Sequence, residues 1–595
     1  METFDHPPRP RLALNVGITG HRAKAIGEEL TGPVREQLRG IFAQLKQAAF
    51  DLRERESAIF ADDDPIVRLH TPLASGSDQL AAEAAQANDF ILRALLPFRI
   101  EEYERDFQGA DLALFKTFLS DANTVMTLPG DRTAHDAYVL VGKAVIAASD
   151  VIVAIWDGER GNGPGGTAHV VELALRENVP VIHLHIDRGN GTASEPRLIS
   201  GGTLDDPDYV PLATQEDFTA LLADILAPHE SIERAQILDY YAEIENRRNY
   251  RIEYPVLLWL LRIKKLPRPL WLQDSIETDI ERERSVLRRS FRPSMRMPLE
   301  RSYGWANFLA IRYAQMFRSG HITNYALSAA AVIVALAGLL APEIKIFLVM
   351  TELVLIGLLF YNTSAGKKGD WHRRWLQYRH LAESLRPLVY LKRSGLSGPP
   401  FRTDFISGAH RREAGTDWTR WYAAAIWREM ASPGGDMTDA EVAALARAAI
   451  EEQVMPQAEY HDVNAERMRH LDHRLHEVGE LLMGFVIATC ILYIIGYFAM
   501  HEVVKSMTNL LVVLTAGLPA AGAAVFGMRG HGEHLLQASR SAESAAALRQ
   551  NARRLSEIDT IEGLAEELQT TSYIMLADLN EWTTAYSERS LEVPA

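Results

Sequence analysis

The stretch DVIVAIWDGERGNGPGGTAHVVELALREN, residues 150–178, decides the fold, because it joins an apolar run to an amphipathic segment through a loop rich in glycine. The six residues after Asp150 are all apolar, which is typical of a strand buried on both faces of a sheet. In residues 168–178 the apolar positions recur with helical spacing. A strand, a glycine-rich turn and a helix in this order predict one unit of a parallel α/β sheet.

The same alternation of strands and helices extends from Leu12 to about His185. Five other short runs are rich in strand-forming residues: residues 12–18, 66–70, 91–97, 124–128 and 179–185. The segments between them have helical spacing, as in residues 142–149. Strands that alternate with helices predict a parallel sheet with right-handed crossovers. We therefore expect an α/β Rossmann-like domain over residues 1–229.

Length and composition limit the function classes. A chain of 595 residues is too long for one core, so several domains are expected. The formal net charge of −16 argues against non-specific binding of the whole surface to nucleic acid or to anionic lipid, and no nucleic-acid partner is expected. The single cysteine, Cys490, excludes an intrachain disulfide. The first residues contain no apolar signal-peptide core, so the N-terminal part is expected in the cytoplasm.

Four apolar segments follow, each on the order of 16 to 20 residues, near the length that a bilayer requires. They are Tyr325–Ala341, Ile344–Tyr361, Leu481–Met500 and Asn509–Met528. Short turns join them into two hairpins, and basic residues flank the outer ends but are almost missing from the turns. By the positive-inside rule this pattern predicts a multi-pass membrane protein with both termini in the cytoplasm. Because two segments are short, a hairpin buried in a soluble core is the alternative.

The two hairpins indicate an internal repeat. Each follows a long polar helix and precedes another one, and the following helices share a local match between residues 376–386 and 536–549. We therefore expect an all-α membrane region with four transmembrane helices after the α/β domain. Its expected parts are a charged helical linker over residues 230–300, a two-helix membrane unit over 301–399, a connector over 400–456 and a second membrane unit over 457–595.

The linker contains YPVLLWLLRIKKLPRPLW, residues 254–271, whose apolar run is too short to cross a bilayer. Two interpretations remain open. The segment lies at the membrane surface with Trp259 and Trp271 at the level of the lipid headgroups, or it is a buried core helix.

Glycine-containing loops follow three of the predicted strands, at residues 17–22, 75–78 and 157–167. In an open parallel sheet the carboxyl ends of the strands meet at one edge, where ligands bind. Glycine lets the backbone approach a phosphate closely, and the dipole of a following helix favours an anion. We expect Thr167 to cap such a helix. One loop of this kind is often a plain turn, but three at one edge indicate a ligand that resembles a nucleotide.

The candidate ligand-binding residues are Gly17, Thr19, Gly20, His21, Arg22, Ser75, Gly76, Asp78, Tyr138, Asp157, Gly165, Gly166, Thr167 and Glu172. Tyr138 and Arg22 are candidates for stacking on a base and pairing with a phosphate, and ordinary helix packing is the alternative for Tyr138. No arrangement of residues predicts a metal site or a catalytic nucleophile, because His183 and His185 have no accompanying carboxylate or cysteine pattern.

Several motifs resemble known families. GITGHR (17–22), ASGSDQLAAEAA (74–85) and residues 137–174 resemble the SLOG superfamily of nucleotide sensors and nucleotide-processing enzymes related to LOG and DprA. The hairpins and residues 375–386, 457–474 and 582–594 resemble SLATT membrane modules. The resemblance implies a bacterial inner-membrane protein, a pore-forming effector of a nucleotide-dependent conflict (anti-phage) system. It also implies that a nucleotide second messenger is the ligand and that the chain forms a homo-oligomer in the lipid bilayer.

One departure from the family motif bears on catalysis. LOG enzymes, which cleave an N-glycosidic bond, carry P-G-G-x-G-T-x-x-E, whereas this chain has Pro164-Gly165-Gly166-Thr167 with Glu172 five positions after the threonine. A shift of two positions turns a side chain by about 200° around a helix. We therefore expect binding without hydrolysis, no catalytic residue and no obligatory cofactor.

The expected ligand is derived from a nucleotide and resembles ADP-ribose, NAD or a cyclic nucleotide. Two other functions remain open: a membrane-tethered hydrolase of a nucleotide or NAD-like molecule, and a passive scaffold.

Glu352, near the middle of the second apolar segment, is a candidate pore residue. A carboxylate at that depth costs roughly 2.5–3.5 kcal/mol and is expected to face water or a partner. The alternative is a protonated glutamic acid hydrogen-bonded between helices, or one paired with Lys345.

Overall fold

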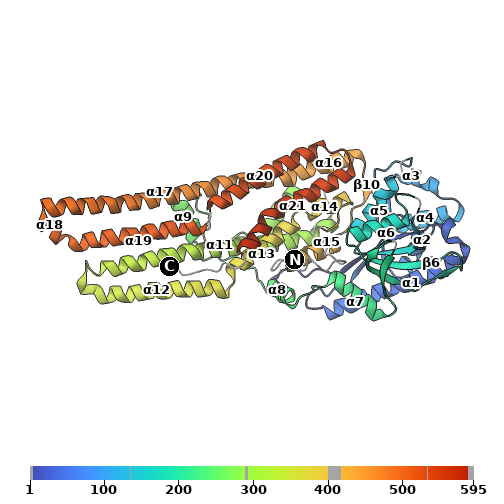
Figure 1. Cartoon of the computed structure of the whole chain (residues 1–595), viewed down its shortest axis with the longest axis horizontal. Coiled ribbons are helices and arrows are strands. Elements are labelled where there is room, and N and C mark those ends of the chain that lie inside the picture. Colours follow the sequence, from blue (N-terminus) through green and yellow to red (C-terminus); the bar gives the residue numbers. More distant parts are fainter. Residues whose placement is uncertain are drawn as a thin grey trace.

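The structure, a computed structural model, shows a sheet domain at one end of an elongated molecule and long helices at the other (Figure 1). It describes residues 5–133, 136–161, 163–204, 206–287, 293–399, 417–532 and 534–586. Residues 400–416, the first part of the expected connector, lie outside the described residues.

All six predicted strands are confirmed. They are β1 (Ala13–Gly20), β2 (Ile66–Thr71), β3 (Ile91–Leu96), β4 (Thr124–Thr127), β5 (Val151–Trp156) and β6 (Val181–Asp187). They form a parallel sheet in the order β4-β3-β2-β1-β5-β6. Every residue of β5 is buried, as its continuous apolar run predicts. The α/β Rossmann-like fold class is therefore correct.

The sheet contains more strands than the sequence predicted. Beyond β6 it continues with the antiparallel strands β8 (Arg197–Thr203) and β9 (Asp206–Pro211), and the short β7 (Thr192–Ala193) pairs with β6. At the opposite edge, β10 (Gly435–Asp436) from the connector pairs in parallel with β4. The connector thus completes the sheet.

Two layers of helices accompany the sheet. Helices α1 (Ala23–Arg55), α2 (Ser77–Ala87), α4 (Gly109–Asp121) and α7 (Gln215–Leu226) pack in one layer. Helices α5 (Asp136–Ala148) and α6 (Thr167–Arg176) pack together and against β1. The one-turn α3 (Ile100–Tyr103) follows β3. The apolar sides of the strands and of these helices form the main core of the molecule.

The linker contains three helices, α8 (Ser231–Tyr241), α9 (Glu253–Leu260) and α10 (Ile276–Leu287). The rest of the chain is almost entirely helical. Its helices are α11 (Pro293–Ala337), α12 (Lys345–Lys368), α13 (Trp371–Leu385), α14 (Leu388–Ser394), α15 (Asp417–Glu429), α16 (Asp439–Ala449), α17 (Met455–Ala499), α18 (His501–Ser506), α19 (Thr508–Gly532), α20 (His534–Glu557) and α21 (Ile561–Tyr586).

Four of these helices are long and apolar enough to cross a bilayer, and each overlaps one of the four predicted segments. At most 17% of the most apolar window of each is buried inside the structure. The hairpins are therefore not buried in a core of this chain. The chain is therefore described as an α/β domain followed by an all-α region with four candidate membrane spans in two hairpins.

The repeat is visible in the helices. In both hairpins the polar helix and the first span form one continuous helix, since α11 and α17 each have 45 residues. A second span of similar length follows, with 24 residues in α12 and 25 in α19. Helices α13 and α20, which carry the matching sequences 376–386 and 536–549, then pack back on α11 and α17 respectively.

Candidate functional site

The order of the sheet strands reverses between β1 and β5, because β2, β3 and β4 lie on one side of β1 and β6 lies on the other. In open α/β sheets this switch point leaves a crevice at the carboxyl ends of the two strands, and ligands bind there. His21 follows β1 and Asp157 follows β5. Two of the predicted residues thus flank the switch point.

A polar cluster occupies this position. Nε2 of His21 lies 3.1 Å from Oδ1 of Asp157, and Nη2 of Arg188 donates to Oδ2 of Asp157 at 2.7 Å. Burial by itself raises the pKa of Asp157, but the N–H of Glu159, His21 and Arg188 together hold that pKa below its usual value. Asp157 therefore remains an anion that orients the side chains of His21 and Arg188.

The first two loops are in direct contact. Both the N–H and the hydroxyl of Ser77 donate to the carbonyl of His21, at 3.1 and 2.9 Å, and the N–H of Ala23 donates to the carbonyl of Ser75 at 3.2 Å. Gly76 has a φ of +96°, and a Cβ there would lie 2.3 Å from the backbone nitrogen of Ala23. A Cβ on Gly20 would lie 2.4 Å from the Ser77 hydroxyl. These two glycines are required for packing of the loops.

The third loop differs, because a Cβ on Gly166 would meet nothing closer than a carbonyl oxygen at 3.5 Å. Gly166 is the N-cap of α6, and no side chain caps that helix. The prediction that Thr167 caps α6 is therefore wrong, since Thr167 is already the first helical residue. Gly165 is closely packed, with a φ of +82° and the Tyr138 Cβ 3.0 Å from the position of an added Cβ.

Helices α2 and α6 both begin at this edge without a side-chain cap. The first N–H groups of a helix have no partner within the helix, and they carry the positive end of its dipole. An anion between the loops can accept hydrogen bonds from such groups. The cationic side chains of Arg22 and Arg188 lie near the same loops.

Asp78 is the buried carboxylate of the site, with 6% of its surface exposed. Its Oδ2 accepts a hydrogen bond from the N–H of Ala74 at 3.1 Å. Burial raises the pKa of Asp78 to about 7, against the opposing effects of Arg22 and of this hydrogen bond. The group therefore exchanges a proton near neutral pH.

The Tyr138 side chain is held on three sides. Its hydroxyl donates to Oδ2 of Asp106 at 2.6 Å, its ring meets the edge of Phe98 at a centroid distance of 6.0 Å, and the Arg22 guanidinium lies 5.7 Å above the ring. Burial, followed by the hydrogen bond to Asp106, raises the pKa of Tyr138 to about 12. Tyr138 thus packs between α5 and the neighbouring loops and also positions Arg22.

Three predicted residues lie apart from the open part of the site. Gly17 and Thr19 are inside β1, and a Cβ on Gly17 would lie 2.4 Å from the Ile152 side chain. The carboxylate of Glu172 pairs with Arg176 one turn further along α6, at 2.6 Å. Five residues of helix place Glu172 about 8 Å from the start of α6 along its axis.

Sequence reasoning missed Arg188 and Asp106. Arg188 follows β6 in the same way that Asp157 follows β5, so its place at the end of a predicted strand was the available signal. Asp106 lies after a one-turn helix, and no pattern in the sequence marks it.

Nδ1 and Nε2 of His183 contact the Tyr209 hydroxyl and the carbonyl of Trp156 at 2.9 and 3.0 Å, so that histidine is held within the sheet. Within the described ranges no group of three or more His, Cys, Asp or Glu side chains is arranged to hold a metal ion.

A second polar cluster, also missed, lies at the amino ends of the same strands. Arg68 on β2 donates to the carbonyls of Arg428 and Glu429 at 2.5 and 2.9 Å. Arg428 at the end of α15 donates to Asp150 at 2.8 Å, and Asp150 accepts from both nitrogens of Asn15 on β1 at 2.9 and 3.0 Å. The signal was the arginine inside the apolar run IVRLH, residues 66–70. We call this set of contacts the α15 anchor.

A scan against models of protein families finds no match, and a search of curated proteins finds no relative. The chemistry of the site therefore rests on its own residues.

Proposed function

We propose that this chain is a membrane effector that senses a nucleotide-derived ligand. It responds through its two hairpins as a ligand-gated pore formed by several copies. The ligand binds at the switch point of the sheet, on the cytoplasmic side of a bacterial inner membrane. Its phosphate is held by the N-terminus of α6, by Arg22 and by Arg188.

The main support for the proposal is that β1, β2 and β5 lead into the loops of the candidate site at one end and contact α15 at the other. Their carboxyl ends carry His21, Ser75–Asp78 and Asp157, while their amino ends carry the α15 anchor. A strand of six residues such as β5 is about 20 Å long and stiff. A ligand that draws the loops together at one end of these strands can therefore shift α15 at the other.

The position of α15 supports the second half of the proposal. Figure 1 shows α15 between the sheet and the long helices of the membrane region, and α15 contacts both α11 and α13. Helix α11 continues without a break into the first span. Movement of α15 thus reaches an apolar helix through direct packing.

The test of the ligand site is Gly166→Val. Because an added Cβ at Gly166 meets no atom closer than 3.5 Å, the variant should fold normally while its side chain covers the start of α6. We expect calorimetry with ADP-ribose, NAD and cyclic nucleotides to show at least one ligand for the natural chain and at least a tenfold loss of affinity for the variant. Gly40→Ala on α1, where an added Cβ meets no atom within 4 Å, is the control. Unchanged affinity of the Gly166→Val protein would place the ligand elsewhere.

One observation favours the hydrolase as a second candidate. Asp78 is a buried carboxyl with a pKa of about 7, and general acid–base catalysis requires a group of this kind. Incubation of the pure protein with the same nucleotides separates the two functions, because an enzyme releases free base and a sensor does not. Loss of base release in Asp78→Asn would assign the chemistry to that carboxyl.

Thermal unfolding with and without ligand tests the alternative that the chain is a passive scaffold. A ligand that binds only the folded state raises the unfolding temperature by mass action. We expect such a rise with the ligand found by calorimetry. A chain that shows neither binding nor stabilisation with any nucleotide would support the scaffold.

A further inference from the structure

A stretch of the linker has a charge opposite to that of the whole chain. Residues 254–273 contain no aspartate or glutamate, although the chain carries a net charge of −16. Four basic side chains in this stretch are exposed, and no ion pair joins them to any described residue: Arg262, Lys264, Lys265 and Arg268. We call residues 254–273 the basic–aromatic segment.

Its beginning lies at the edge of the apolar helices that is nearer to the sheet domain. Nη1 of Arg251 donates to Oδ1 of Asn362 at 2.7 Å, and Nη2 donates to the hydroxyl of Thr323 at 3.1 Å. Asn362 directly follows the apolar run that ends at Tyr361, and Thr323 precedes the run that begins at Tyr325. The first hairpin therefore enters its apolar band at the level of Arg251.

Helix α9 then crosses to the second hairpin. Leu258 is 5% exposed and forms a cluster with Leu471 and Leu475 on α17, and Val525 on α19 packs against that cluster. Leu475 precedes the apolar run beginning at Leu481 by six residues, which is about 9 Å along the helix. The first part of the basic–aromatic segment, helix α9, thus touches both hairpins close to the same edge of the apolar band.

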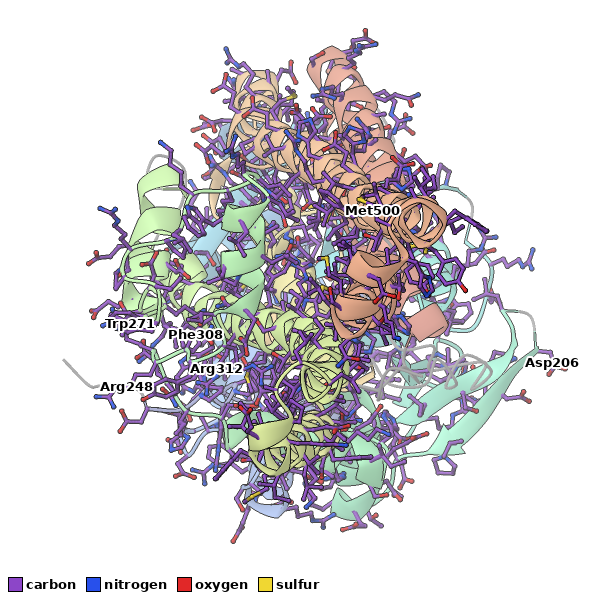
Figure 2. The ribbon with its side chains drawn as sticks, turned by 90° about the vertical axis from the view of Figure 1, so that its left-hand side faces the viewer. Asp206, Arg248, Trp271, Phe308, Arg312 and Met500 are labelled. Carbon is purple, nitrogen blue, oxygen red and sulfur yellow. The ribbon has the colours of Figure 1, made fainter. Side chains whose placement is uncertain are left out.

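The other side of the segment is open and aromatic. The exposed fractions are 49% for Trp259, 63% for Leu260 and 61% for Trp271. Figure 2, which looks from the hairpin end, shows Trp271 toward the outer rim of the molecule. The structure thus excludes the interpretation of α9 as a helix buried on all sides. Tryptophan at the boundary of an apolar band and cations just outside it are the pattern of a membrane interface.

We propose that the basic–aromatic segment rests on the surface of the bilayer and binds anionic phospholipid headgroups through Arg262, Lys264, Lys265 and Arg268. Trp259 and Leu260 enter the boundary between headgroups and acyl chains. Anionic lipid complements the four cations, and the apolar helices beside the segment place it at that depth. Since α9 packs on both hairpins, the bound lipid also holds the hairpins together. This proposal does not depend on the nucleotide ligand.

The depth of the segment is tested by quenching of fluorescence. The only native cysteine is removed by Cys490→Ser, and Leu260→Cys is labelled with bimane in the full chain. The protein is placed in nanodiscs that contain phosphatidylglycerol and a lipid with a nitroxide at its headgroup. Ile232→Cys on α8, with an exposed fraction of 64%, is the control because α8 lies away from the apolar helices (Figure 1). We expect at least twofold stronger quenching at residue 260 than at residue 232. Equal quenching at both positions overturns the proposal.

The role of the charges is tested separately. The four basic residues of the segment are changed to Gln, and a control changes four exposed basic residues of the sheet domain to Gln: Lys24, Arg99, Arg105 and Lys143. We expect the quenching at residue 260 to fall at least twofold in the segment variant and to stay the same in the control. The natural segment should also be quenched at least twofold less in discs of phosphatidylcholine alone. Quenching that is equal with neutral and anionic lipid overturns the assignment to anionic headgroups.

Discussion

Asp78 lies in the first turn of α2, where its carboxyl is buried and within the electrostatic influence of Arg22. Burial raises its pKa to about 7, so the carboxyl is largely neutral at pH 6 and largely ionised at pH 8. An anionic ligand beside it therefore meets an additional negative charge at the higher pH. The raised pKa also means that the folded state binds the proton more tightly than the unfolded state does.

We predict that nucleotide affinity falls by about tenfold from pH 6 to pH 8, since roughly 1.4 kcal/mol of repulsion corresponds to a factor of ten. Asp78→Asn should bind with nearly constant affinity over this range. By linkage, the contribution of Asp78 to the free energy of unfolding falls as the pH rises from about 4 to about 7, so Asp78→Asn should also unfold at a higher temperature at pH 8. Calorimetry and thermal unfolding at both pH values measure these effects. A pH dependence that persists in the Asn variant would assign the titration to another group.

At the scale of elements, α15 is held to the sheet by a buried ion pair. The side chains of Arg428 and Asp150 are 11% and 8% exposed, and their atoms Nε and Oδ1 lie 2.8 Å apart. Removal of one partner from such a pair leaves a buried charge without compensation. The contact between the sheet domain and the helical region therefore requires both partners of this pair.

We predict that Arg428→Met lowers the free energy of unfolding by about 3 kcal/mol, as expected for breaking a buried pair. Arg55→Met is a matched control, because Arg55 pairs with Glu216 at 2.8 Å but both side chains are more than half exposed. The control should change stability by less than about 1 kcal/mol. Thermal unfolding in detergent measures both variants. Equal effects would show that α15 does not depend on this pair.

Glu352 lies on the half-buried side of α12, inside the second apolar segment. No ion pair joins it to Lys345 in the part of the chain that the structure describes, so the expected alternative of such a pair has no support there. We predict that Glu352→Gln lowers ligand-triggered currents in planar bilayers or reduces their preference for cations. Currents with unchanged selectivity would make Glu352 a structural residue.

At the scale of the molecule, the four apolar helices form an open row (Figure 1). Helix α11 packs against α12 and α19, and α17 packs against α19, so that α12 and α17 are the outer helices. Only 6% of the most apolar window is buried in each outer helix, compared with 17% in each inner one. A row of this kind encloses no path through one chain, and the proposed pore therefore requires several copies.

The proposed topology predicts which positions a reagent outside the cell reaches. Tags at residue 2 and at the C-terminus should both be protected in intact cells, because the basic flanks of the hairpins are expected on the cytoplasmic side. A tag inserted beside Lys505, in the turn between the last two spans, should be accessible. A terminal tag that is labelled from outside would contradict the proposed orientation.

Much of the fold followed from local patterns. The apolar runs that became β1 to β6 and the four spans were recognisable because burial on both faces of a sheet and the thickness of a bilayer each demand continuous apolar sequence. The glycine loops correctly indicated the ends of β1 and β5. They did not indicate the separate roles of the glycines, because Gly76 meets the backbone of Ala23 only after the two loops have packed together.

The sequence by itself thus determined the alternation of strands and helices, the four apolar helices and the edge of the sheet that carries His21 and Asp157. Only the tertiary structure decided that Arg188 completes this cluster and that Arg428 pairs with Asp150, 278 residues earlier in the chain. It also decided that α9 joins the two hairpins. The physical reason is that periodicity and length report the environment of a segment, whereas a partner distant in sequence is selected by packing of the whole chain.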